Sequence, residues 1–122
     1  MATVLGIGGV FFTSPDPQVL NAWYRQHLRF DLSDQPGVAF FPKTMPASGY
    51  TVWSVFPAST RYFDPSTRGF MINLVVDDLD AALAQVRAGG ARLEGHVESH
   101  DNGRFGWFVD PDGNKVELWE PR

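Results

Sequence analysis

The stretch DPDGNKVEL, residues 110–118, decides the fold. Its first part, Asp110–Asn114, combines proline, glycine and short polar side chains, which is a strong signal for a tight turn. Residues typical of strands flank the turn on both sides, over about 104–109 and 115–120. The sequence therefore predicts a β-hairpin in this part of the chain.

An internal duplication extends the pattern toward the start of the chain. Residues 10–16, VFFTSPD, and residues 72–78, INLVVDD, both read as a strand that runs into a turn. The second copy lies 62 positions after the first. This repeat predicts two similar units within one chain.

A helical pattern follows each copy. Asp16 or Ser14 can cap the first helix, which carries Pro17 in its first turn. Asp78 can cap the second helix, and Gly89-Gly90 ends it. Apolar residues recur at helical spacing in both, so each helix is expected to bury one face.

Shorter segments with strand character come after each helix. They lie at about 37–41 and 50–56 in the first half, and at about 92–100 ahead of the hairpin. A loop at 57–69 joins the two halves. The sequence thus predicts one domain over 1–122 with two modules, at about 5–60 and 69–120. Each module is too small to be stable alone, so we expect them to fold together and to be completed by dimerisation.

The composition excludes several classes of function. With 43% hydrophobic and 20% charged residues the chain is globular, and its net charge of −4 without a basic run argues against nucleic acid as a partner. No apolar stretch is long enough for a membrane span, and Met1–Gly9 lacks the pattern of a secretory signal. The absence of cysteine excludes disulfides and thiol catalysis, so a cytoplasmic location is the default expectation.

Three motifs resemble the vicinal oxygen chelate superfamily, which includes glyoxalases, bleomycin-resistance proteins and extradiol dioxygenases. They are the helix end at 23–30, WYRQHLRF, where Arg29 replaces the usual glycine; the strand-to-helix junction at 76–80, VDDLD; and the hairpin at 110–118. The resemblance implies an α+β fold of two tandem βαβββ modules that form a cupped mixed sheet. It does not fix the function, because the superfamily contains isomerases, dioxygenases, transferases and binding proteins.

The resemblance also implies where a divalent metal would bind. Relatives use His or Glu from the first strand of each module and a carboxylate from the last, and these positions correspond to Gly9, Met71, Trp53 or Val55, and Glu117. Only Glu117 suits such an ion, since a thioether prefers copper(I) and zinc needs about three protein ligands. A shift of one residue supplies no better ligand. We therefore expect no metal or other cofactor, with a divalent ion at Glu117 as the alternative.

Glu117 itself has two interpretations. Val116 and Leu118 should face the helices, so Lys115, Glu117 and Trp119 should face the cup, the side of the sheet away from the helices. There Glu117 can act as a catalytic acid or base. It can equally pair with Lys115 or Arg61 and have no chemical role, or be an ordinary surface residue.

A second metal candidate is the alternating set Glu94, His96, Glu98 and His100. Alternate residues share one face of a strand, and imidazole and carboxylate both bind divalent ions. Such neighbours stand about 7 Å apart on a straight strand, so three cannot easily meet at one ion. The competing interpretation is a polar edge strand whose charges discourage pairing.

The cup is the predicted small-molecule site. Asn73 and Glu117 would supply polar groups in an apolar wall, and this composition is common in small-molecule sites. The candidate ligand-binding residues are Phe11, Trp53, Met71, Asn73, Trp107, Glu117, Trp119 and Arg61, with Thr13, Val55 and Val75 nearby. Loop residues that can attract an anionic ligand at the rim are Arg61, Tyr62, Arg68 and Arg104. Alternatively, the aromatic rings simply fill the cup as core.

Three functions follow as hypotheses. The first is a glyoxalase-like homodimer that binds a small molecule in the aromatic cup without a metal, as bleomycin-resistance proteins do. The second is a lyase, isomerase or dioxygenase of the same superfamily, either metal-dependent or with Glu117 as general base. The third is a purely structural or regulatory dimer.

Overall fold

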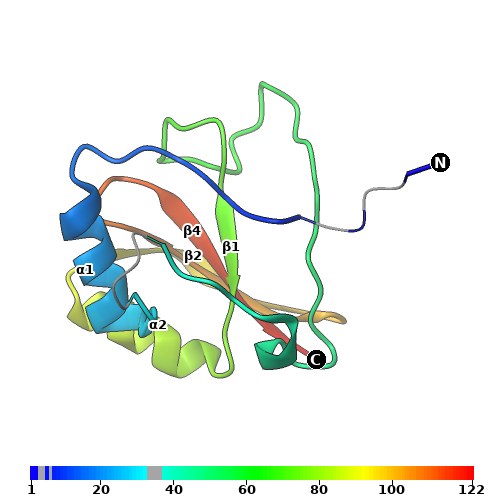
Figure 1. Ribbon diagram of the computed structural model, residues 1–122. Helices are drawn as coiled ribbons and strands as arrows, with labels where there is room; N and C mark the ends of the chain where they lie inside the picture. Colours follow the sequence, from blue (N-terminus) through cyan, green and yellow to red (C-terminus); the bar gives the residue numbers. More distant parts are fainter. Residues whose placement is uncertain (3–4, 6, 33–36) are drawn as a thin grey trace.

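The fold is described from a computed structural model that places residues 1–2, 5, 7–32 and 37–122 (Figure 1). The second half of the chain forms a mixed sheet of four strands in the order β1-β4-β3-β2. β1 is parallel to β4, and the other neighbours are antiparallel. The elements are α1 (Pro17–Leu28), the 3-10 helix η1 (Pro42–Thr44), β1 (Ile72–Val75), α2 (Leu79–Ala88), β2 (Arg92–His100), β3 (Gly103–Val109) and β4 (Lys115–Pro121).

The expected α+β class, the hairpin and the strand before it are confirmed. β2 has the predicted bounds, and β3 and β4 each extend one residue beyond the prediction. The strand at the second repeat copy is shorter than expected and stops at Val75. Asp78 then caps α2, as predicted, by accepting a hydrogen bond from the backbone N–H of Ala81 at 3.0 Å.

The turn between β3 and β4 is held by one buried carboxylate. Asp110 accepts hydrogen bonds from the backbone N–H groups of Asp112 and Asn114 at 3.0 and 2.9 Å. Its other oxygen accepts from the amide of Asn114 and from the hydroxyl of Tyr24 on α1, both at 2.9 Å. Gly113 takes the positive φ of 83° that the turn needs. The hairpin is thereby tied to the first helix of the chain.

The core lies between the two helices and one face of the sheet. α1 and α2 pack side by side there, and the Trp23 indole donates to the carbonyl of Gly89 at 2.9 Å. Phe108, Val116 and Leu118 point from the sheet into this core, which confirms the predicted facing of the last strand. No helix among the described residues is long and apolar enough to cross a membrane.

The first half differs from the prediction. Residues 10–16, 37–41 and 50–56 are all described, yet none of them forms a strand. Apart from α1 and η1, the described residues of this half lie in loops and turns, and Figure 1 shows the segment after η1 passing along one side of the sheet. A strand needs a neighbouring backbone to take its hydrogen bonds, and here these segments have none. The two tandem modules are therefore not fully confirmed: in the single chain, the described residues of module one form no strand.

Arg29 ends α1 in a left-handed conformation, with φ 60° and ψ 35°. A side chain in this region costs about 1–2 kcal/mol that glycine avoids. We expect Arg29→Gly to raise the free energy of unfolding by about 1 kcal/mol. Urea unfolding at neutral pH measures it. Arg87→Gly, the same change in the helical backbone of α2, is the control and should destabilise by up to about 1 kcal/mol. A loss of stability in Arg29→Gly would contradict the assignment of strain.

The contact of Tyr24 with Asp110 predicts a dependence on alkaline pH. Burial, and then the neighbouring carboxylate, raise the pKa of Tyr24 far above its ordinary value. The resulting stabilisation is complete below the ordinary pKa of about 10 and is lost as the pH rises toward the raised one. We expect the free energy of unfolding to fall above about pH 10. Tyr24→Phe should cost about 1–2 kcal/mol at pH 7 and show a weaker alkaline fall in urea titrations.

Candidate functional site

Three neighbouring strands bring polar and aromatic side chains together on the cup face, the side of the sheet away from the helices. Asn73 of β1 and Trp107 of β3 are both register partners of Glu117, which lies on β4 between them. Register partners on adjacent strands point to the same face of a sheet. These three residues, all predicted from the sequence, form the centre of the candidate site.

The Glu117 carboxylate accepts three hydrogen bonds in this site. The amide of Asn73 donates to Oε1 at 2.6 Å, and the indole N–H of Trp107 donates to Oε2 at 2.8 Å. The hydroxyl of Tyr62 also donates to Oε2, at 2.6 Å. Trp107 is only 6% exposed and forms the floor, while Asn73 is open to solvent. All three donors are neutral groups, so the carboxylate keeps its full negative charge.

Tyr62 reaches the site from the loop that precedes β1. Its ring stacks on Phe56 at 5.6 Å and meets the edge of Trp107 at 6.3 Å between ring centroids. Burial, together with the hydrogen bond to Glu117, raises the pKa of this tyrosine well above its ordinary value. Its hydroxyl therefore stays protonated and acts as a donor. The sequence analysis placed Tyr62 only at the rim, because a loop residue has no strand register that ties it to Glu117.

Lys115 also faces the cup, two positions before Glu117 on β4. Its ammonium donates to the backbone carbonyl of Tyr62 at 2.6 Å. It lies 5.1 Å from the centroid of the Tyr62 ring and 5.9 Å from that of Trp107, within the range of cation–π attraction. The expected pairing of Lys115 with Glu117 is absent from the ion pairs of the described residues.

Trp119 and Met71 lie outside this cluster. Trp119 is buried, donates to the carbonyl of Asn102 at 2.9 Å, and packs between Phe105 and Tyr50. It lies on the cup face of β4, two positions after Glu117, opposite Phe105 of β3. Met71 is half-buried directly before β1. For both residues, contact with a ligand stays a prediction.

The structure does not bring Phe11, Trp53 and Arg61 to Glu117. Phe11 is 94% and Trp53 80% exposed, because the strands that would have carried them are not formed. Arg61 pairs with Asp64 at 3.2 Å on the surface. The other arginines predicted at the rim are also engaged: Arg68 donates to the carbonyl of Thr13, and Arg104 binds Asp80.

The donors around Glu117 do not suit a divalent cation. N–H and O–H groups point toward the carboxylate from three sides, where a metal site would place further lone pairs. Within the described part of the chain, no three His, Cys, Asp or Glu side chains are grouped to hold an ion. On β2, a bulge between Glu94 and Glu98 interrupts the alternation, and His100 contacts Glu98 at 3.0 Å. Metal binding by the protein itself stays a question for experiment.

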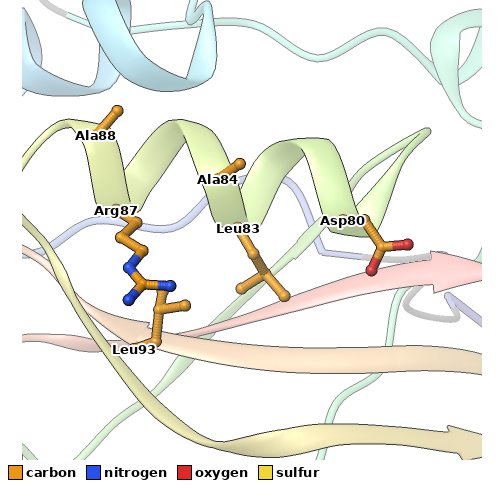
Figure 2. A pocket seen from close by; sticks show the side chains of 6 residues that line it. All are labelled: Asp80, Leu83, Ala84, Arg87, Ala88 and Leu93. Atoms are coloured by element: carbon orange, nitrogen blue, oxygen red, sulfur yellow. The ribbon is translucent and has the colours of Figure 1, made fainter.

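A shallow hollow of about 490 Å³ lies on the opposite, helical side of the sheet (Figure 2). It runs along the outer face of α2 beside β2. The residues that line it are Asp80, Leu83, Ala84, Arg87, Ala88 and Leu93. Its walls are largely alanine and leucine, and it shares no residue with the Glu117 cluster. We therefore place the candidate site on the cup face.

The family follows from comparison with known proteins. A model of the glyoxalase-like domain matches residues 9–119. Since this match spans nearly the whole chain, the protein belongs to the glyoxalase-like domain family, and the resemblance to the vicinal oxygen chelate superfamily is confirmed. The comparison with curated proteins gave no match.

Solved structures support the same fold. TnmS3, an antibiotic binding protein from Streptomyces sp. CB03234, is 26% identical over 88% of each chain, with a TM-score of 0.52. A glyoxylase/bleomycin resistance protein/dioxygenase domain from Frankia sp. EAN1pec is 15% identical over 98% of this chain and 100% of the other, with a TM-score of 0.59. A superfamily member from Sphaerobacter thermophilus is 34% identical, but the match spans 40% of each chain, with a TM-score of 0.37.

The carboxylate network predicts the effect of a minimal substitution. In Glu117→Gln, the remaining carbonyl oxygen can accept from Tyr62 and Trp107 only without the negative charge, and the new NH2 group meets the donor of Asn73. We expect a loss of about 1–3 kcal/mol in the free energy of unfolding. Denaturant unfolding followed by tryptophan fluorescence measures it. Glu94→Gln removes one exposed ion pair with Arg92 and should change stability by less than about 1 kcal/mol. Equal effects of the two substitutions would contradict the network.

Proposed function

We propose that this glyoxalase-like protein binds a small molecule on the cup face, without the metal site usual in its superfamily. The observation that carries the proposal is the arrangement around Glu117. A charged acceptor is held in place by Asn73, Tyr62 and Trp107, above the buried ring of Trp107 and beside Asn73, which is open to solvent. A few fixed polar groups in an aromatic wall are what a small-molecule site needs.

Two further points support a binding role. The carboxylate already has three protein donors, so it has no need of an ion to compensate its burial. A neighbour of the same fold, TnmS3, is an antibiotic binding protein. A binding role for this chain agrees with that relative.

We propose a homodimer as the functional state. Large apolar side chains of the first half are strongly exposed in the single chain: Val10, Phe11, Phe40, Phe41, Val52, Trp53 and Val55. Exposed apolar surface of this kind is typical of an interface. A second copy can cover it and supply strand partners to these segments, which would also bring Phe11 and Trp53 into a shared cup. We expect light scattering after gel filtration to give twice the chain mass, and Trp53→Glu to shift it toward the monomer.

A second candidate is an enzyme of the same superfamily, a lyase or isomerase, with Glu117 as general base. The contact that favours it is the 2.6 Å hydrogen bond between Tyr62 and Glu117, because such a pair can pass a proton between a ligand and the carboxylate. Turnover that survives removal of metals by a chelator and is lost in Glu117→Gln would support this candidate over pure binding.

A ligand screen tests the proposed function. Protein purified without a histidine tag is titrated with a library of small aromatic compounds, with thermal shift and quenching of tryptophan fluorescence as the readouts. We expect saturable binding that weakens at least about tenfold in Trp107→Phe or Glu117→Gln and persists in Asp80→Asn, which lies on the helical side of the sheet. Metal analysis of the same preparation should find much less than one divalent ion per chain. A stoichiometric ion lost in Glu117→Gln, or the absence of any ligand, would overturn the proposal.

A further inference from the structure

We infer that the ligand of the cup is an organic cation, and that the ammonium of Lys115 lies where the charged group of this ligand binds. This inference rests on the proposed function and names the chemical class of its ligand. It comes from the positive charge of Lys115 on the cup face, and from the groups that surround this charge.

The surroundings of Lys115 are those of a cation site. Two aromatic rings, Tyr62 and Trp107, approach its ammonium at 5.1 and 5.9 Å, and the carbonyl of Tyr62 accepts its hydrogen bond at 2.6 Å. Aromatic faces together with a carbonyl acceptor are the usual means of recognising an ammonium group. Lys115 comes from the edge of the site on a flexible four-carbon chain, so its charged end can move out to water when another cation arrives.

The charge of the site favours the same ligand class. Glu117 receives only neutral donors, and no ion pair within 4.0 Å reaches it from the described residues. The carboxylate of Glu98 also acts on Tyr62, where its negative charge, added to that of Glu117, raises the pKa of the hydroxyl. Another cation on this face, Arg92, pairs with Glu94 at 2.6 Å, so its charge is already offset. A cation entering the cup gains attraction from Glu117.

An anionic ligand lacks comparable partners. Arg61 is paired with Asp64, and Arg104 with Asp80 and Glu120. Arg68 is directed toward the carbonyl of Thr13 and the ring of Phe70. The arginines that the sequence placed at the rim therefore bind elsewhere, and an anion would meet Glu117 and Glu98 instead.

Three probes that differ mainly in charge test the inference on the full chain. They are 3-phenylpropylamine, 3-phenylpropan-1-ol and 3-phenylpropanoate, titrated at neutral pH with tryptophan fluorescence as the readout. We expect the amine to bind at least about tenfold more tightly than the alcohol, and the carboxylate to bind most weakly. The preference for the amine should shrink as salt is added, because part of it is electrostatic.

A pair of lysine substitutions tests the place of Lys115. Lys115→Met keeps the aliphatic chain but removes the competing charge, so we expect it to bind the amine several-fold more tightly than the unaltered protein does. Lys43→Met, on the exposed helix η1, is the matched control and should leave the affinity unchanged. Weaker binding of the amine in Lys115→Met, with circular dichroism and melting temperature intact, would overturn the idea that the lysine stands in for the ligand.

The outcomes separate this inference from the proposed function. If the alcohol or the carboxylate binds as well as the amine, and Trp107→Phe weakens that binding, the cup is a ligand site but not one for cations. If none of the three probes binds but an uncharged library compound does, the cup is again a ligand site but not one for cations. If nothing in the probe set or the library binds, the inference and the proposed function are both wrong.

Discussion

The structure depends on the buried carboxylate of Asp110. It accepts hydrogen bonds from two backbone N–H groups of the turn, which fixes how β3 and β4 pair. It also accepts a hydrogen bond from the hydroxyl of Tyr24, which fixes where α1 lies against the hairpin. That pairing places Trp107 opposite Glu117. A slip of one residue would turn every side chain of a strand to the other face, so the candidate site exists only because the turn is closed in this way. The packing of the core and the geometry of the site therefore both depend on the hydrogen bonds of Asp110.

Sequence reasoning succeeded where the signal was local. The turn residues, the capping aspartates and the alternation of β4 each lie within a few positions of the structure they specify. They sufficed to place Asn73 and Glu117 on one face, whereas the face of Trp107 was left open. It failed where the partner is distant in the sequence. The three expected strands of the first half have suitable residues but no backbone neighbour within the single chain. Tyr62 likewise meets Glu117 across 55 positions, and no periodic pattern connects a loop to a strand.

Glu117 lies where the resemblance to the vicinal oxygen chelate superfamily predicts a metal ligand. An isolated negative charge in a partly buried site is costly, and a cation is only one way to offset it. Here an amide, an indole and a phenol share that role, each contributing a single hydrogen bond. The charge remains available to a ligand, because neutral donors reduce the desolvation cost without cancelling the charge.

The site is built from two parts with different constraints. The floor belongs to the hairpin, where a change of residue disturbs the packing of the sheet. The donor above it, Tyr62, belongs to the loop between the halves, where length and composition can vary at little cost to the core. For the proposed binding function, this division means that changes in the loop alone can alter ligand selectivity, while the carboxylate stays in a fixed position.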